Sequence, residues 1–218
     1  MRSPGQVSSS FATLVDERSR VGHAPIVSPP RNAASCREMA RYARGVPEDL
    51  SRHIAFIGFM GAGKSTMAEL TAQRLGRTWF DTDHVIVERC GRSIPELFAS
   101  GEQDQFRAME KQVIAELLVG EPAVLSLGGG ALEDADTRTL LFERAFVVNL
   151  DVSWQEVQAE LPTLMSTRPL LQNRTEDEIH ELFLRRQATY NKAHVRIHAP
   201  RGDIEAAAEH VFSMLTVA

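Results

Sequence analysis

Short apolar runs and longer amphipathic stretches alternate along the chain from residue 52 onward. The runs are apolar at successive positions, as in HIAFI at 53–57 and AFVVNL at 145–150. Continuous apolar runs are typical of parallel strands that helices cover on both faces. The pattern predicts five strands, at 53–57, 78–80, 123–127, 145–150 and 195–198.

The stretches between these runs have the apolar spacing of helices. Seven helices are predicted, at 64–75, 93–99, 104–118, 133–143, 154–160, 176–192 and 203–215. Strands that alternate with helices form an α/β fold, here an open parallel sheet sandwiched by helices, with right-handed crossovers. Ligands of such sheets bind beyond the carboxyl ends of the strands.

The first fifty residues show neither the apolar pattern of strands nor that of helices. They contain clusters such as SSS at 8–10 and SPP at 28–30. Such a segment buries too little apolar surface to offset its ordering entropy. We therefore predict a disordered extension at 1–50, with at most a short helix at 37–44, and one folded domain at 51–218. A weak transit-peptide character, a dispensable tail and a translation start at Met39 are the alternatives for the extension.

Composition narrows the class of protein. The formal net charge of −5 argues against binding to nucleic acid, which normally needs a basic excess. No apolar run approaches the roughly 20 residues that cross a bilayer. Cys36 and Cys90 form no C-x-x-C pair, so free thiols in a reducing compartment are expected. We expect a cytoplasmic monomer that binds neither nucleic acid nor membrane.

A Gly-rich segment directly follows the first predicted strand. Residues 58–66 read GFMGAGKST and match G-x-x-x-x-G-K-[ST] in full, between a strand and a helix. Backbone N–H groups of such a loop wrap phosphate oxygens, which requires glycine. The predicted ATP-binding residues of this loop are Gly61, Ala62, Gly63, Lys64, Ser65 and Thr66. Lys64 should contact the β- and γ-phosphates, and the Ser65 hydroxyl should bind Mg²⁺.

Two acidic residues, Asp81 and Asp83, follow the second predicted strand. At a strand end, one carboxylate can reach the Mg²⁺ shell while the other accepts a hydroxyl proton from an acceptor. Asp is also favoured at the start of a helix, so a helix cap is the alternative interpretation.

Six further segments occur in an order that resembles the shikimate kinase family. They are SIPELF at 93–98, GE at 101–102, FRAME at 106–110, LGGGA at 127–131, TRPLL at 167–171 and RQATY at 186–190. The resemblance extends from about residue 53 to the C-terminus, and the ordered set is far more specific than any single segment. It implies a P-loop fold like that of the nucleoside-monophosphate kinases, with ATP, Mg²⁺ and shikimate as ligands.

The resemblance also implies roles for residues near the transferred phosphate. Asp83 is implied to hold acceptor hydroxyls and to act as the base, while Asp81 belongs to the outer Mg²⁺ shell. Arg168, in a mobile lid, is implied to contact ATP and the transferring phosphoryl group. The predicted catalytic residues are therefore Asp83, Lys64 and Arg168.

The resemblance places the acceptor against two arginines and a glycine segment. Arg107, oriented by Glu110, and Arg186 are implied to bind the shikimate carboxylate. Two planar guanidinium forks suit one carboxylate. Gly128, Gly129 and Gly130 are implied to bring backbone N–H groups against the acceptor, where a side chain would collide.

The chain departs from the family pattern in two places. Three residues, 103–105, separate the GE and FRAME segments where the family usually has two. One extra helical residue rotates the rest of its helix by about 100°, so we expect it to be harmless only if it is absorbed before the helix begins. The segment 158–165 lacks the basic residue that the family's lid usually carries, which predicts weaker ATP binding. Pro162 should shorten the helix that leads into the lid.

We therefore expect transfer of the ATP γ-phosphoryl group to the 3-hydroxyl of shikimate, in aromatic amino-acid biosynthesis. A kinase of the same fold with another small acceptor, such as gluconate or a nucleoside monophosphate, is the first alternative. It leaves Arg107 and Arg186 without a shared carboxylate. The second is a non-catalytic module that senses an aromatic ligand. It would need a docking domain, which fifty low-complexity residues are too few to form.

Overall fold

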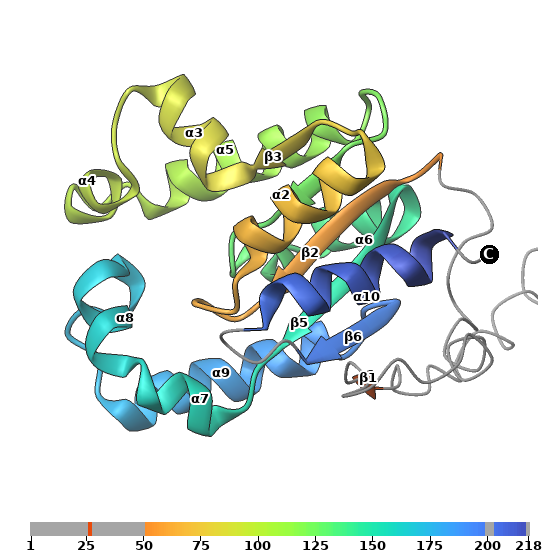
Figure 1. Cartoon of the computed structure of the whole chain (residues 1–218). Coiled ribbons are helices and arrows are strands. Elements are labelled where there is room, and N and C mark those ends of the chain that lie inside the picture. The colour runs from red at the N-terminus through yellow and green to blue at the C-terminus, as the bar shows by residue number, and fades with distance from the viewer. Residues whose placement is uncertain (1–25, 28–50, 199–202, 217–218) are drawn as a thin grey trace, which may run out of the picture.

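Helices lie on both sides of one parallel sheet in the computed structural model (Figure 1). The structure describes residues 26–27, 51–198 and 203–216. The described strands are β1 (Ile26–Val27), β2 (His53–Gly58), β3 (Trp79–Asp81), β4 (Val124–Ser126), β5 (Ala145–Asp151) and β6 (Val195–His198). Their order is β1-β6-β5-β2-β4-β3, and every neighbouring pair is parallel. The predicted open parallel α/β sheet is confirmed.

All seven predicted helices occur among the described residues, with ends within two residues of those expected. The α-helices are α2 (Lys64–Leu75), α3 (Thr82–Cys90), α4 (Ile94–Ala99), α5 (Gln103–Leu117), α6 (Ala135–Arg144), α7 (Trp154–Ala159), α8 (Leu161–Thr167), α9 (Glu176–Tyr190) and α10 (Ile204–Thr216). Two 3₁₀ turns are η1 (Ala131–Glu133) and η2 (Pro169–Leu171).

Two helices, α3 and α8, were not predicted. Helix α3 follows β3 without a loop, because the Asp81 side chain caps it by accepting the backbone N–H groups of Asp83 and His84. Pro162 has the predicted effect on α7, which ends at Ala159. The same proline then lies in the first turn of α8, where its missing N–H needs no partner.

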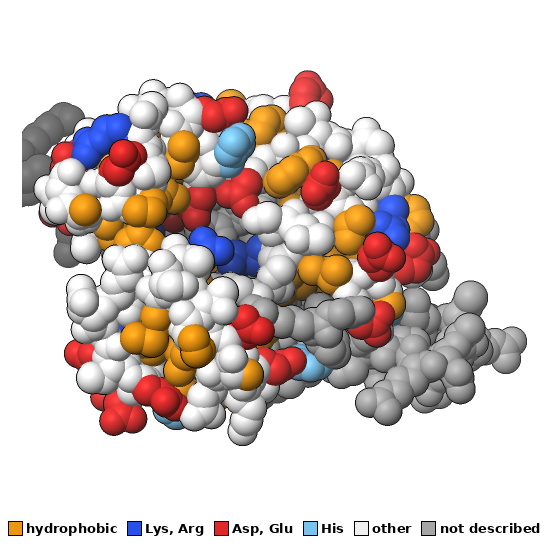
Figure 2. All heavy atoms as spheres, turned by 60° about the vertical axis from the view of Figure 1, so that its left-hand side comes forward, with side chains coloured by type: hydrophobic (Ala, Val, Ile, Leu, Met, Phe, Trp, Pro, Cys, Tyr) orange, Lys and Arg blue, Asp and Glu red, His pale blue; other side chains and the backbone are white. Residues whose placement is uncertain are grey.

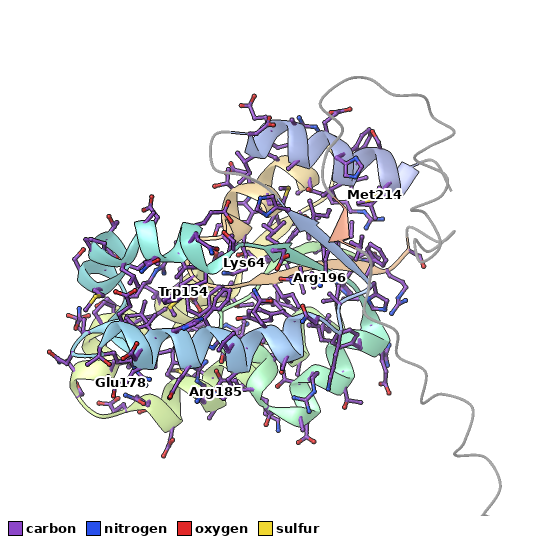
Figure 3. All side chains as sticks on the ribbon, turned by 90° about the horizontal axis from the view of Figure 1, so that it is seen from below. Lys64, Trp154, Glu178, Arg185, Arg196 and Met214 are labelled. Atoms are coloured by element: carbon purple, nitrogen blue, oxygen red, sulfur yellow. The ribbon has the colours of Figure 1, made fainter. Side chains whose placement is uncertain are left out.

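The side chains of β2 alternate between two apolar layers. Ile54 and Phe56 pack with α2 and α10, whereas Ala55 and Ile57 pack with α5, α6 and α9. Figure 3 shows these layers from below, with Met214 of α10 on one side of the sheet and Arg185 of α9 on the other. This double covering explains why the strands read as uninterrupted apolar runs.

Only two residues of the predicted extension are described. Ile26 and Val27 form β1, which pairs in parallel with Arg196 and Ile197 of β6. The short helix predicted at 37–44 lies outside the described residues. The disordered extension and the domain boundary near residue 50 stay predictions. None of the described helices is long and apolar enough to span a membrane.

The register of the sheet places polar residues together at its carboxyl edge. Asp81, the last residue of β3, pairs with Ser126, the last residue of β4. Ser126 pairs in turn with Phe56 of β2, two residues before the strand ends at Gly58. The Gly-rich loop, Asp81 and Ser126 therefore meet at one edge, where ligands of parallel sheets bind.

Two histidines tie strand ends together through their ring nitrogens. The His53 Nδ1 atom accepts the backbone N–H of Ala123 at 3.1 Å, and the His194 Nδ1 atom accepts that of Val147 at 2.9 Å. Burial lowers the pKa of both imidazoles, and the nearby Arg52 lowers that of His194 further. Both rings are therefore neutral in the folded protein, with Nδ1 unprotonated.

We expect acidification from about pH 7.5 to about pH 5.5 to destabilise the protein partly through these two rings. Their folded pKa values lie below the ordinary value near 6.5, so the unfolded chain binds more protons just below that pH. The stabilisation that comes from the two neutral rings is therefore present above about pH 6.5 and is lost as the pH falls. Urea unfolding at both pH values should show a smaller loss for a His53→Asn, His194→Asn double variant than for the parent.

The exposed His84, which pairs with Glu88 at 3.2 Å, provides the control. A His84→Asn variant should lose as much stability on acidification as the parent does. Equal losses for the parent and the double variant would contradict the prediction.

Candidate active site

A cleft of about 370 Å³ opens at the carboxyl edge of the sheet. Figure 2 shows basic side chains at the bottom of a hollow, with acidic side chains beside them. Many of the predicted site residues line this cleft: Lys64, Ser65, Asp81, Asp83, Arg107, Gly128, Gly129, Gly130, Arg168 and Arg186. The other four, Gly61, Ala62, Gly63 and Thr66, are not on its wall and form the Gly-rich loop and the start of α2.

The loop at 58–63 turns from β2 directly into α2. Gly63 precedes the helix with φ at 81°, a left-handed conformation that other residues rarely adopt. Because Gly63 has no side chain, none caps the first N–H groups of α2. A helix start left open in this way is a binding site for phosphate or another anion.

Lys64 folds back over this loop. Its Nζ atom donates to the carbonyl oxygens of Gly58 and Phe59, both at 3.1 Å. Burial lowers the pKa of Lys64 to about 8, although the carboxylates of Asp83 and Asp81 favour its charged form. The ammonium group is therefore held at the loop, next to the open start of α2.

Three oxygen atoms gather between the loop and the ends of β3 and β4. The Ser65 and Ser126 hydroxyls donate to Asp81 Oδ2 at 2.5 Å and 3.0 Å, and lie 3.3 Å from each other. The other carboxylate oxygen, Oδ1, caps α3 by accepting the N–H groups of Asp83 and His84 at 3.0 Å and 3.3 Å. Asp81 thus serves both as the helix cap and as the hydrogen-bond acceptor of the two hydroxyls.

This oxygen cluster fits Mg²⁺, which prefers oxygen ligands and keeps several waters and phosphates in its shell. Within the described ranges, no three His, Cys, Asp or Glu side chains gather to hold a metal ion alone. A metal ion here would therefore depend on a second source of oxygen ligands. Ser126 was not predicted as a site residue, although a polar residue at the end of an apolar strand was a usable signal.

Two carboxylate oxygens without described partners face Gly128. Asp83 Oδ1 and Glu110 Oε1 are buried and accept no hydrogen bond from the described residues. A Cβ atom on Gly128 would lie 2.8 Å and 2.4 Å from these oxygens, so both lie within 3 Å of one point. Burial raises the pKa of both carboxyl groups. The site therefore has two acceptors ready for hydroxyl or similar donors.

Arg107 reaches the cleft from α5. Its Nη1 atom pairs with Glu110 Oε2 at 2.5 Å, and its guanidinium carbon lies 5.2 Å from the centre of the Phe106 ring. A Cβ atom on Gly130 would lie 2.6 Å from Arg107 Nη2. Only a glycine lets this guanidinium lie so close to the backbone.

Arg186 reaches the same glycine segment from α9. Only 3% of Arg186 is exposed, and its Nε atom donates to Glu133 Oε1 at 2.8 Å. Its Nη1 atom lies 3.2 Å from the position of a Cβ atom on Gly129. The Tyr190 hydroxyl, one helical turn further along α9, donates to the Gly129 carbonyl at 2.5 Å. Burial raises the pKa of Tyr190 to about 12, so this hydroxyl remains a donor.

The extra residue at 103–105 does not turn Arg107 away. Helix α5 begins at Gln103, so the extra residue lies inside the helix and is not absorbed before it. Arg107 nevertheless lines the cleft. Gly101, in the turn before the helix, has φ at 74°. That Arg107 binds the acceptor in spite of the extra residue stays a prediction.

Arg168 lies between α8 and η2, on the segment predicted to be a lid. Its side chain is exposed, lines the cleft and has no hydrogen bond or ion pair with the described residues. Residues of η2 contact α4, and residues of both elements line the cleft. In the segment without the expected basic residue, Gln158 donates to Glu176 of α9 at 2.5 Å. The predicted weakness of ATP binding stays a prediction.

Comparison with known proteins agrees with this geometry. The family model for shikimate kinase matches residues 60–216. The shikimate kinase of Geobacillus kaustophilus is 41% identical over 162 residues, which cover 73% of this chain and 86% of that protein. The shikimate kinase of Bacillus subtilis is 34% identical over 167 residues, covering 76% of this chain and 90% of that protein.

Solved structures show the same fold. The structure of shikimate kinase from Acinetobacter baumannii in complex with shikimate has a TM-score of 0.70 and is 32% identical, covering 76% of this chain and 93% of that one. The structure of shikimate kinase from Aquifex aeolicus has a TM-score of 0.64 and 30% identity, with 74% and 95% covered. The chain therefore belongs to the shikimate kinase family.

Proposed function

We propose that the protein transfers the γ-phosphoryl group of ATP to the 3-hydroxyl of shikimate, giving shikimate 3-phosphate and ADP, within aromatic amino-acid biosynthesis. The observation that carries this proposal is a single cleft that joins a phosphate-binding loop to two arginines, Arg107 and Arg186. A loop of this kind selects a nucleotide, and two guanidinium groups select an acceptor with a carboxylate. Sequence identity of 41% to a shikimate kinase supports the choice of acceptor.

On the nucleotide side, the backbone N–H groups of Gly61, Ala62 and Gly63 and the start of α2 at Thr66 hold the phosphates. Lys64 exchanges the two loop carbonyls for phosphate oxygens, and its charge then lies on the group in transfer. Ser65 would hold Mg²⁺ directly and Asp81 would hold it through the outer shell. Such an ion would supply charge neutralisation for the phosphates.

On the acceptor side, Arg107 and Arg186 hold the carboxylate, while Gly128, Gly129 and Gly130 leave room for the ring. Asp83 accepts the proton of the attacking hydroxyl. Burial and the neighbouring Asp81 raise the pKa of Asp83, which makes its carboxylate a stronger base. Lys64, Arg168 and Arg107 act in the opposite direction and favour the ionised form that a base requires.

Arg168 completes the site from the lid. Since its guanidinium group has no partner among the described residues and faces the cleft, it is available for the transferring phosphoryl group. Closure of the lid would exclude water, which otherwise competes with the acceptor for the phosphoryl group. A monomeric, cytoplasmic enzyme remains our prediction.

A coupled assay of ADP release tests this function. Turnover should depend on shikimate and be near background without it, because the closed site positions only the acceptor hydroxyl for attack. Gluconate and a nucleoside monophosphate serve as alternative acceptors in the same assay. Equal turnover with either one, or ADP release that shikimate does not increase, would contradict the proposal.

A Gly128→Ala substitution should lower kcat/KM by roughly a hundredfold or more, because the new methyl group displaces two reacting-site carboxylates. Its carbon would lie 2.4 Å from Glu110 Oε1 and 2.8 Å from Asp83 Oδ1. Gly120→Ala is the matched control, since its added carbon meets only the Leu117 carbonyl, at 3.4 Å. Steady-state kinetics of both variants decide. Parental activity in Gly128→Ala would show that the carboxylates do not need this space.

An Arg107→Ala substitution should raise the KM for shikimate by about tenfold to a hundredfold, since one of two partners of the carboxylate is lost. The affinity for ATP should change by no more than a few-fold. Arg89→Ala removes an exposed pair with Glu116 on the neighbouring helix and should leave both constants unchanged. Titration calorimetry with each ligand makes the measurement. If Arg107→Ala binds shikimate as tightly as the parent does, Arg107 does not contribute to the acceptor site.

A further inference from the structure

Glu133 is an acidic residue next to the acceptor site that the sequence motifs do not identify. It ends η1, three residues after the glycine segment. Glu133 does not line the cleft but lines two smaller cavities outside it, of about 320 Å³ and 260 Å³. Arg186 lines both the cleft and the second of these cavities. Glu133 therefore approaches Arg186 from the side away from the acceptor.

The Glu133 carboxylate is the only ion-pair partner of Arg186 among the described residues. The two side chains differ in exposure, with 3% of the Arg186 side chain exposed and 50% of the Glu133 side chain. A buried guanidinium group without a partner is costly and tends to change its rotamer or its surroundings. The pair with Glu133 thus holds the side chain of Arg186 in one conformation.

The atoms involved determine which edge of the guanidinium group faces the cleft. Glu133 Oε1 accepts the Nε–H group at 2.8 Å, whereas Nη1 lies beside Gly129 on the cleft wall. Because a guanidinium group is planar, fixing Nε also fixes the direction of both terminal nitrogens. The terminal nitrogens then remain free for a carboxylate in the cleft.

We propose that Glu133 is a positioning residue for acceptor recognition, which fixes Arg186 so that its terminal nitrogens meet the acceptor carboxylate. This inference rests on the function proposed above. Glu133 does for Arg186 what Glu110 does for Arg107, with one difference. Glu110 lies on the cleft wall and one of its oxygens has no described partner, whereas Glu133 lies outside the cleft.

A glutamate that pairs with Arg186 could instead compete with the acceptor carboxylate, and such competition would need a different geometry. A glutamate that competed with the acceptor would bind the terminal nitrogens from within the cleft. Glu133 binds Nε and lies off the cleft wall, so its pair with Arg186 is compatible with a bound acceptor. Preorganisation of this kind lowers the entropy lost when the acceptor binds.

Two substitutions of Glu133 separate orientation from charge. Glu133→Ala removes both the acceptor oxygen and the charge, and should raise the KM for shikimate roughly tenfold while the KM for ATP stays within about twofold. Glu133→Gln keeps an oxygen that accepts the Nε–H group, and should restore the KM for shikimate to within about threefold of the parent. Asp136→Ala is the control, because Asp136 forms an exposed pair with Lys111 at 2.7 Å in the adjacent helix.

A double-mutant cycle shows whether the effect passes through Arg186. In an Arg186→Ala background, Glu133→Ala should not raise the KM for shikimate further. A lower KM for shikimate in both Glu133→Ala and Glu133→Gln would mean competition. An unchanged KM for shikimate in Glu133→Ala would mean no role in positioning. Equal changes in the KM for shikimate and for ATP would mean general structural damage. Each of these three outcomes would overturn the inference.

The parent enzyme separates this inference from the function on which it rests. If the parent shows no shikimate-dependent release of ADP, the proposed function fails. If the parent is active and the Glu133 variants behave like it, only the positioning role of Glu133 fails.

Discussion

The carboxylate of Asp81 connects more parts of the site than any other described group. One oxygen caps α3, which carries Asp83, and the other accepts the hydroxyls of Ser65 and Ser126. The start of α3, the Gly-rich loop and the end of β4 are therefore held at one point. The parallel register that places Asp81 opposite Ser126 makes this connection possible. Helix capping and the contacts with the two hydroxyls use different oxygens of the same residue, so they do not compete.

The charges of the cleft are arranged so that each of two arginines has its own glutamate. Arg107 pairs with Glu110, and Arg186 pairs with Glu133. Without these partners, two cations close to the glycine segment would repel each other and carry an uncompensated desolvation cost. With them, the free protein keeps both guanidinium groups oriented before an acceptor arrives. A carboxylate bound as proposed would then add to an arrangement that is already neutralised in part.

Much of the fold follows from local pattern, because strands covered on both faces are apolar throughout and helices are not. The missed α-helices, α3 and α8, are short, and each begins within a residue or two of the element before it. Site residues within the motifs could be predicted, since the chemistry of phosphate and carboxylate binding restricts their types. Ser126 was missed although its place at the end of an apolar strand was a usable signal. The contacts of Glu133 could not be predicted, because they depend on which residues the fold brings beside it. A pair such as Arg186 and Glu133, 53 positions apart, leaves no local signal.

The position of Arg107 shows why an insertion in a helix need not disturb a site. The rotation of α5 is set by its buried residues Phe106, Glu110, Val113 and Ile114, which lie on one face and pack into the domain. These residues all lie after the extra residue. Their contacts therefore set the rotation of the helix, and the residues before them have to adjust. Turning α5 by about 100° to accommodate the insertion would expose this face and bury a polar one. Moving the exposed first turn and the turn at Gly101 costs far less. An extra residue at the start of α5 is therefore accommodated most easily ahead of this packed face, and Arg107 lines the cleft.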